Sequence, residues 1–420
     1  MPTLTIVLLT DNTLRELAGL RFLKTELQHT LRERNPDVRI IGSIAEVQHT
    51  LYKLHSIQPH IVFISQIQEK YCRMIAQYVK DSGALLFVLP SEVTPARSVQ
   101  SLIVSSHMQY DQLLDGIFLP GKKMRSFFAT TDISKQKLFV TGSPKIDVAF
   151  RSGGLDRPTF QKKYSLPPKR KNVFIFTSFP KRDVSYYESD DCFSENILFM
   201  TRVHQAIRQT ETAYLATLPK ICQALPDSNI ILKPHPLEDT EKYSVISSPN
   251  FRTIKDASIV DCLPSIDLAI HWNSTVCTEC WFHQIPTLQY SPVQDADWLL
   301  SDFSPGNPVF ASVDKLIDSA QAILNKKRKL SKTYHDFQKG YIEENYYKPD
   351  SKSSQRIAQK VQRLLLKRIP QPAFMEQHKS FWTVVEFLHS ITSIYVSRKL
   401  LSLLFRNYKW RYALENFVDE

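Results

Sequence analysis

The order of apolar segments is the feature that most restricts the fold of this 420-residue chain. Short runs of almost uninterrupted apolar residues alternate with amphipathic stretches, and this series occurs twice. Strands that are apolar along their whole length are typical of parallel sheets covered by helices on both faces. Residues 151–171, which are rich in Pro, Gly, Lys and Arg, separate the two series. The sequence therefore predicts an α/β protein with two doubly wound Rossmann-like domains joined by a linker.

Each predicted domain contains several strands and helices. In residues 1–150 the predicted strands are Leu4–Leu9, Val38–Ile41, His60–Ser65, Ala84–Leu89, Gly116–Leu119 and Lys137–Thr141. The predicted helices of that domain are Thr13–Arg34, Ile44–Leu54 and Glu69–Ser82. In residues 172–350 the predicted strands are Asn172–Thr177, Asn229–Lys233, Phe251–Ile254, Leu268–Ile270 and Thr287–Tyr290. The predicted helices there are Glu195–Leu225 and Ser274–His283. We expect a ligand between the domains, at the carboxyl ends of strands.

The last seventy residues have a different pattern. Ser351–Arg368 reads as one helix, so we expect a crossover helix in residues 351–370 and a separate tail in residues 371–420. The tail contains a long helical pattern, Gln377–Tyr412, in which Trp and Tyr accompany many Lys and Arg residues. This composition is typical of a helix lying at a membrane interface. The alternative is a helix packed on the body of the protein or on a partner subunit.

A formal net charge of +11 indicates an acidic partner, which could be nucleic acid, an anionic membrane or a phosphorylated substrate. Nucleic acid is not expected, because no cluster of aromatic and basic residues occurs outside the tail. The GxGxxG and GxxxxGK[ST] fingerprints are both missing, which argues against dinucleotide-binding Rossmann and P-loop proteins. The chain shows neither a signal peptide nor eighteen consecutive apolar residues, so we expect a cytoplasmic protein without a membrane span.

The first candidate site is the sequence KPHP at Lys233–Pro236, which follows a predicted buried strand. Two prolines stiffen the turn and hold His235 at the carboxyl end of that strand. A fixed imidazole there could donate a hydrogen bond to a phosphate or a leaving group, and Lys233 could add positive charge. The alternative is a histidine that merely closes a turn. We favour the functional interpretation, with His235 catalytic and Lys233 binding substrate.

The second candidate site is the sequence HWNST at His271–Thr275, where a strand gives way to a helix. Asn273, Ser274 and Thr275 are good N-cap residues, and the free amides of a helix start attract phosphate. Glu279 lies about one turn beyond Thr275, where it could accept hydrogen bonds from ribose hydroxyls. The alternative is ordinary capping without a ligand. We expect His271, Asn273, Ser274, Thr275 and Glu279 to bind substrate.

The first domain carries a third candidate motif at Gly142 and Ser143, in a tight turn after its last strand. We expect both residues to contact substrate, whereas Asp147 either anchors the turn or faces the ligand. An acceptor hydroxyl also needs a general base. The candidate carboxylates near strand ends are Asp11, Glu16 and Glu92, and the sequence does not rank them.

Two patterns could indicate metal or redox chemistry. Asp295 and Asp297 form a DxD sequence, but they open a predicted helix, where acids are common because of the helix dipole. Cys277 and Cys280 have CxxC spacing, but they lie inside a predicted helix and no second CxxC exists. We therefore expect no metal and no cofactor.

The ordered set of motifs resembles bacterial surface carbohydrate biosynthesis proteins. It also resembles the neighbouring CDP-glycerol glycerophosphotransferases, polysialyltransferases and Kdo transferases, all with the GT-B fold. The matching segments are Arg15–Leu17, Asp115–Gly121, Val140–Asp147, Lys233–Pro236 and His271–Thr275 with Glu279. Together they cover roughly residues 1–300. Two features depart from the family pattern: Arg15 is preceded by Thr-Asp-Asn-Thr-Leu and not by the acidic lead of the family, and the basic tail extends past the shared region.

The resemblance implies a donor nucleotide held by the second domain, with its phosphates on the His-Pro turn and the Ser/Thr turn. It also implies a cytidine nucleotide and metal-independent chemistry. We therefore expect a glycosyltransferase of capsule or lipopolysaccharide synthesis. This enzyme would transfer an acidic sugar from a CMP-activated donor to a glycan or lipid-linked glycan acceptor at the inner membrane face. The alternatives are a CDP-glycerol glycerophosphotransferase, a sugar-nucleotide 2-epimerase and a membrane-associated scaffold without enzymatic activity.

Overall fold

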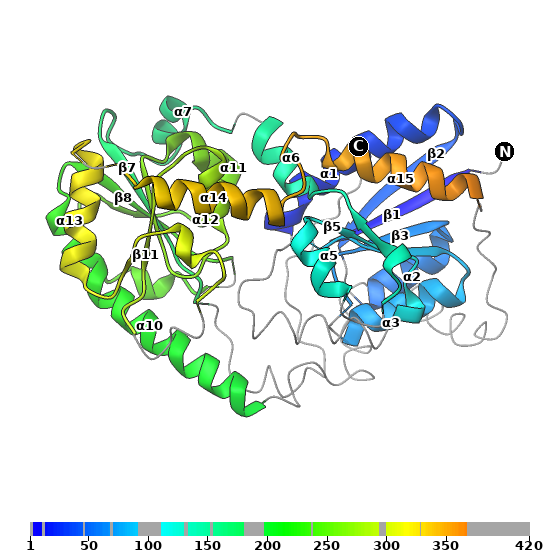
Figure 1. The fold of residues 1–420 in the computed structure, drawn as a ribbon, viewed down its shortest axis with the longest axis horizontal. Coiled ribbons are helices and arrows are strands. Elements are labelled where there is room, and N and C mark those ends of the chain that lie inside the picture. Colours follow the sequence, from blue (N-terminus) through cyan, green and yellow to red (C-terminus); the bar gives the residue numbers. More distant parts are fainter. Residues whose placement is uncertain are drawn as a thin grey trace, which may run out of the picture.

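A computed structural model describes most of the chain in two α/β domains (Figure 1). The described residues are 3–10, 13–44, 47–67, 70–90, 111–129, 133–151, 154–179, 197–236, 238–293, 300–327 and 329–367. They form two six-stranded sheets in which every pair of neighbouring strands is parallel. The predicted architecture of two doubly wound parallel sheets is confirmed.

The sheet of the first domain has the strand order β2-β1-β3-β4-β5-β6. Its strands are β1 (Leu4–Thr10), β2 (Val38–Ile44), β3 (Ile61–Ile64), β4 (Leu85–Val88), β5 (Gly116–Leu119) and β6 (Leu138–Val140). Its helices are α1 (Thr13–Arg32), α2 (Val47–Ile57), α3 (Lys70–Asp81), α5 (Lys122–Phe128) and α6 (Pro144–Arg151). Side chains of β1 alternate between two cores, with Val7 and Leu9 on one face and Ile6 and Leu8 on the other. This alternation is the period of two expected for a strand buried on both faces.

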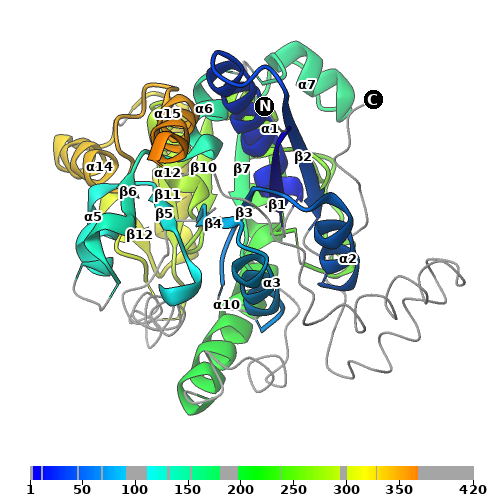
Figure 2. The ribbon, with the colours of Figure 1, turned by 90° about the vertical axis from the view of Figure 1, so that its right-hand side faces the viewer.

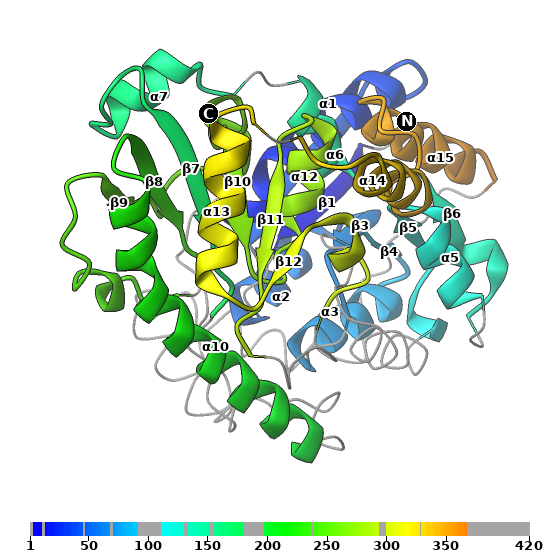
Figure 3. The ribbon, with the colours of Figure 1, turned by 60° about the vertical axis from the view of Figure 1, so that its left-hand side comes forward.

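The sheet of the second domain has the order β12-β11-β10-β7-β8-β9. Its strands are β7 (Lys171–Phe176), β8 (Ser228–Lys233), β9 (Phe251–Thr253), β10 (Leu268–His271), β11 (Thr287–Tyr290) and β12 (Val309–Phe310). The long helix α10 (Ile197–Ala224) and α13 (Val313–Leu324) cover one face (Figure 3). On the opposite side lie α7 (Arg157–Lys163), α11 (Ile259–Cys262) and α12 (Val276–Phe282). Short 3-10 helices occur in both domains: Asp111–Leu113 and Lys135–Lys137 in the first, and Glu241–Tyr243, Leu263–Ser265 and Ser304–Gly306 in the second.

The chain leaves the second domain through α14 (Lys332–Asn345) and returns to the first domain as α15 (Ser353–Lys367). Helix α15 lies beside α1 and α6, as Figures 1 and 2 both show. Its residues Ile357, Ala358 and Val361 are completely buried in the core that α1 forms with the first sheet. The segment that we expected to be a crossover helix therefore completes the core of the first domain.

Helices α5, α6, α11, α13 and α14 were not predicted, and two further segments differ from the sequence-based expectation. Residues 151–171, which we expected to be a linker, contain α7, and Phe160 of this helix is completely buried in the second domain. Asp156 begins α7 by accepting a hydrogen bond from the Thr159 amide at 2.7 Å, an N-cap contact that fixes the helix start. Strand β12 was not predicted, because two residues are too few to show a periodic pattern.

Candidate active site

The register of the second sheet brings the two predicted motifs together. Lys233 on β8 pairs with Phe176 on β7, which in turn pairs with His271 on β10. Because all three strands are parallel, the turns that follow them lie at the same edge of the sheet. The His235 turn and the Ser274 turn therefore stand on either side of the segment that follows β7.

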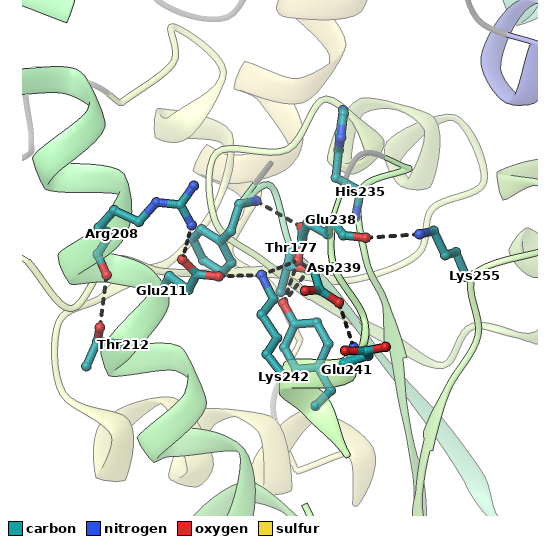
Figure 4. A network of polar contacts seen from close by, with 12 residues as sticks. Thr177, Arg208, Glu211, Thr212, His235, Glu238, Asp239, Glu241, Lys242 and Lys255 are labelled. Atoms are coloured by element: carbon teal, nitrogen blue, oxygen red, sulfur yellow. Dashed lines mark hydrogen bonds and ion pairs between the residues drawn. The ribbon is translucent and has the colours of Figure 1, made fainter. Parts of the chain in front are cut away.

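A buried carboxylate holds the His235 turn. Glu238 is only 1% exposed, and its Oε1 accepts hydrogen bonds from the backbone amides of His235 at 3.1 Å and Phe179 at 2.9 Å. Its Oε2 accepts from Thr177 Oγ1 at 3.1 Å and from the Tyr243 hydroxyl at 2.5 Å. Figure 4 shows the imidazole of His235 directed away from this network. The imidazole is half-buried, so it can reach a ligand while its backbone is anchored.

Cations balance the buried charge of this network. Lys242 Nζ lies 3.2 Å from Glu238 Oε2 and also pairs with Glu211 of α10, whose other oxygen lies 2.5 Å from Arg208. Burial, followed by the charge of Glu238, raises the pKa of Tyr243 far above its usual value, so the phenol stays a hydrogen-bond donor. The network thus links the His235 turn to α10.

Lys233 lies beside this network but has its own partner. Its Nζ donates to the Lys255 carbonyl at 3.0 Å, and Lys255 Nζ donates to the Glu238 carbonyl at 3.0 Å. Burial lowers the pKa of Lys233 from its usual value. The structure therefore shows Lys233 in a contact that links the ends of β8 and β9.

His271 has a different environment from the one expected. Its side chain is completely buried, and burial lowers its pKa to about 4, so the imidazole is neutral at pH 7. Its Nδ1 lies 3.5 Å from the amide nitrogen of Ser274. In this conformation His271 is positioned to orient the turn, and no surface of its side chain is open to a ligand.

The turn after β10 is shaped by Asn273, which has a positive φ of 50°. Its Oδ1 accepts from the Ser301 amide at 2.8 Å and from the Ser301 hydroxyl, which ties the turn to a neighbouring loop. Ser274 and Thr275 are both partly exposed, and Thr275 is the N-cap of α12 without a side-chain cap bond. Ser274 Oγ accepts a hydrogen bond from the Val276 amide at 3.4 Å, so its hydroxyl proton can still be donated to a ligand.

Glu279 pairs with a residue of the first domain. Its Oε1 lies 2.7 Å from Lys145 Nζ, and the side chain of Glu279 is 3% exposed compared with 21% for Lys145. Lys145 belongs to α6, which follows the Gly142–Ser143 turn. The ion pair thus joins the start of α12 in the second domain to the third predicted motif in the first.

Lys145 also lines a pocket at the carboxyl ends of β1, β3, β4 and β6. The polar lining residues are Glu16, Ser65, Ser143 and Lys145, and the walls are apolar. Glu16 is 7% exposed and its Oε2 accepts a hydrogen bond from Thr10 Oγ1 at 2.7 Å. This pocket contains two of the predicted site residues, Glu16 and Ser143. The other two candidate carboxylates, Asp11 and Glu92, lie outside the described residues.

Gly142 and Asp147 hold the crossover segment. Gly142 has a φ of +88°, and a Cβ placed there would lie 2.2 Å from the Ser353 hydroxyl. Asp147 is 1% exposed and accepts hydrogen bonds from the amides of Ser353 at 2.9 Å and Ser354 at 2.6 Å. Of the two roles expected for Asp147, the structure shows the anchoring one. Gly142 sits against Ser353 at the start of α15.

No group of three or more His, Cys, Asp or Glu side chains within the described ranges is arranged to hold a metal ion. Asp295 and Asp297 lie outside those ranges. Cys277 and Cys280 lie within α12, as expected, and burial raises the pKa of both thiols well above the usual value. Across the same described ranges, no helix is long and apolar enough to cross a membrane.

Two residues of this site were missed by the sequence reasoning. Glu238 lies three residues after His235, a spacing at which a side chain can bind the backbone of its own turn. That spacing was a usable signal. Lys145 lies between two motif residues, Ser143 and Asp147, but its partner Glu279 belongs to the other domain, so no local pattern indicates the pair.

Comparisons with known proteins identify the fold. No family model matches the chain, and no curated protein matches it by sequence. A variant of the wall teichoic acid polymerase TagF soaked with CDPG is similar in structure, with a TM-score of 0.58 at 12% identity over 87% of this chain and 90% of that one. A putative UDP-N-acetylglucosamine 2-epimerase from Listeria monocytogenes has a TM-score of 0.56 at 11% identity, covering 89% of this chain and 100% of that one.

A third similar structure is the complex of S. aureus MnaA with UDP, with a TM-score of 0.54 at 12% identity over 88% of this chain and 99% of that one. These identities are low, so the similarity concerns the fold and not the reaction. Two six-stranded parallel sheets, each flanked by helices, are the architecture that these neighbours share with the chain. The protein therefore has the GT-B fold.

Proposed function

We propose that this protein is a glycosyltransferase of surface polysaccharide synthesis, which transfers an acidic sugar from a CMP-activated donor to a glycan acceptor. The observation that carries the proposal is the position of Lys145. It lines the pocket that contains Glu16 in the first domain, and its ammonium group binds Glu279 at the start of α12 in the second. In this proposal the pocket would bind the acceptor and the turn before α12 would bind the donor, and the Lys145–Glu279 contact between them supports a transfer reaction.

The second domain would bind the donor. The hydroxyls of Ser274 and Thr275 and the imidazole of His235 are accessible beside the segment that follows β7, where they can donate hydrogen bonds to phosphate oxygens. Lys233 and Asn273 would support these turns, while Glu279 would accept hydrogen bonds from the ribose once Lys145 moves aside. Gly142 and Ser143 would border the same space from the first domain.

The first domain would activate the acceptor. In the proposed step an acceptor hydroxyl attacks the anomeric carbon, and the bond from that carbon to the phosphate oxygen breaks. Glu16 takes the proton of the hydroxyl, and the phosphate leaves with the bonding electrons while His235 donates a hydrogen bond or a proton to it. Glu92 and Asp11 are the other candidates for the base. The chemistry uses only side chains of this chain, and we propose no metal and no cofactor.

A second candidate is glycerophosphate transfer from CDP-glycerol. The observation behind it is that TagF, whose variant was soaked with CDPG, shares the fold of this chain. The proposed phosphate contacts of His235, Ser274 and Thr275 suit either donor. The 2-epimerase alternative has the same fold but needs no acceptor.

The first experiment is thermal unfolding of the purified protein with CMP, CDP, UMP, UDP or GDP. A nucleotide at ~100 times its dissociation constant stabilises the folded state by about 2.7 kcal/mol. We expect the largest rise in melting temperature with CMP. A rise with CDP alone would favour glycerophosphate transfer, and one with UDP alone would favour the epimerase or an ordinary hexosyltransferase. No rise with any nucleotide would contradict the proposal and favour the scaffold alternative.

The second experiment is the substitution His235→Ala, with His335→Ala as its matched control because His335 is exposed on α14. We expect kcat to fall at least 100-fold for the first variant, as is usual when a general acid or a hydrogen-bond donor to the leaving phosphate is removed. The control should keep wild-type activity. Activity of His235→Ala within threefold of wild type would refute the role of this histidine.

The tail in residues 371–420 lies outside the described residues, and we propose that it binds the protein to the anionic inner face of the cytoplasmic membrane. Truncation after Pro370 tests this role, because α15 ends at Lys367 and the crossover helix remains complete. We expect full-length protein to bind vesicles containing anionic lipid and the truncated protein to stay in solution. Equal binding by both forms would show that the tail is not the membrane anchor.

A further inference from the structure

Glu238 is a charged residue in an unusual, buried position. It lies in the loop between β8 and β9, yet it is only 1% exposed. Burying a carboxylate costs several kcal/mol unless hydrogen bonds and a cation replace its water. Here four hydrogen-bond donors and one cation, from three segments of the chain, surround its two oxygens. The donors are Thr177 Oγ1, the amides of Phe179 and His235 and the Tyr243 hydroxyl, and the cation is Lys242 Nζ.

The donors are divided between the two oxygens by type. Oε1 accepts only backbone amides, from Phe179 at 2.9 Å and from His235 at 3.1 Å. These amides belong to the segments that follow β7 and β8, two strands that lie side by side in the sheet. A single oxygen atom therefore fixes the distance between the two loops.

The side-chain donors bind the other oxygen and leave the imidazole of His235 outside the network. Oε2 accepts hydrogen bonds from Thr177 and Tyr243 and forms an ion pair with Lys242, which also pairs with Glu211 on α10 (Figure 4). Figure 4 shows the His235 ring directed away from the carboxylate. Within this network, Glu238 Oε1 holds the backbone of His235.

We propose that Glu238 is a positioning residue for the transfer reaction, which acts by fixing the backbone of His235 against the end of β7. This inference rests on the proposed function, in which the His235 imidazole acts on the donor phosphate. The length of the Glu238 side chain (its reach to the two amides), and not its charge, is the property that matters for this role. A carboxylate or an amide of the same length can hold both backbone amides, whereas a shorter side chain cannot.

Three substitutions separate reach from charge. Glu238→Gln keeps the length and one carbonyl oxygen for the two amides but removes the charge. Glu238→Asp keeps the charge but is one methylene shorter. Lys242→Met removes the cation and leaves the bonds to the turn in place. Asp239→Asn is the matched control, because Asp239 is the neighbouring acid and caps Glu241 instead of the His235 turn.

We expect Glu238→Asp to lower kcat at least 30-fold, while Glu238→Gln and Lys242→Met stay within about fivefold and Asp239→Asn within twofold of wild type. Nucleotide KM should change less than kcat in Glu238→Asp, since the Ser274 turn remains. Melting temperatures of all variants identify any that fail to fold. If Glu238→Gln is as inactive as Glu238→Asp, the length of the side chain is not sufficient, its charge is also required, and the proposal is wrong.

Hydrogen exchange tests the anchor without any substrate. We expect the amides of Phe179 and His235 to exchange at least tenfold faster in Glu238→Asp than in wild type, and at a nearly unchanged rate in Asp239→Asn. Unchanged exchange in Glu238→Asp would overturn the inference. If wild-type protein binds no nucleotide but the exchange result holds, the proposed function fails while the anchor itself is supported.

Discussion

The ion pair between Lys145 and Glu279 gives a prediction about the contact between the two domains. The two side chains differ in exposure, 21% for Lys145 and 3% for Glu279. Removing Lys145 leaves a carboxylate buried without its cation, whereas removing the charge of Glu279 leaves a lysine whose long stem can turn its ammonium group to water. The two substitutions should therefore have unequal effects on the free energy of unfolding.

We expect Lys145→Met to lower the free energy of unfolding by about 3 kcal/mol, within the range for breaking a buried pair. Glu279→Gln should cost about 1 kcal/mol, close to the value for a lost hydrogen bond. The double variant should be more stable than Lys145→Met alone, because it contains no unpaired buried charge.

The assay is urea unfolding followed by tryptophan fluorescence, to which Trp281 contributes from a cluster that also contains Ile146 of α6. Equal penalties for Lys145→Met and Glu279→Gln would refute the reasoning from exposure. A penalty below 1 kcal/mol for Lys145→Met would show that the ion pair does not hold the domains together. The exposed substitution Lys339→Met on α14 serves as the control for removing a lysine.

Three further predictions concern stability. The pKa of His271 is lowered from 6.5 to about 4, so its imidazole binds a proton more readily in the unfolded state than in the folded state. Its contribution to the free energy of unfolding should be fully present above pH 6.5 and should fall by up to about 3 kcal/mol as the pH drops towards 4. His271→Asn should remove this dependence, as measured by urea unfolding at several pH values; an unchanged pH profile would contradict it. Gly142→Ala should lower the free energy of unfolding by about 1–3 kcal/mol, because Gly142 has a positive φ and lies against the Ser353 hydroxyl. Gly340→Ala should instead stabilise the protein by roughly 0.5–1 kcal/mol, because Gly340 has open space around it in α14. Thermal unfolding of both variants compares them, and equal shifts would refute this. Asp147→Ala should cost about 1–2 kcal/mol through the lost capping of α15, and a melting temperature equal to wild type would contradict that role.

Much of the fold could be predicted because it depends on local patterns. Apolar runs located most strands to within a few residues. Helix α7 was missed because its start depends on one cap residue, Asp156, in a segment without apolar periodicity. Short apolar segments such as β12 carry too few residues for any periodic signal.

The candidate site was predictable in part, because the sequence locates the ends of strands but not how deeply each side chain is buried. The motifs placed His235 and Ser274 at the same edge of the sheet, as the strand register confirms. Nothing in the local sequence distinguishes the completely buried His271 from the half-buried His235, since packing by distant elements decides their exposure. The pairing of Lys145 with Glu279 likewise depends on how the domains meet.

The return of α15 to the first domain also affects the order in which this protein can fold during synthesis. Leu20, Leu23 and Leu27 of α1 share a core with Ile357, Ala358 and Val361 of α15, which leave the ribosome only after the whole second domain. Domains usually fold in the order in which they are made. Here the second domain can fold first, while the first domain still lacks α15 and leaves an apolar face of α1 uncovered. A nascent chain that stalls after α14 would expose that face, which makes it a natural substrate for chaperones.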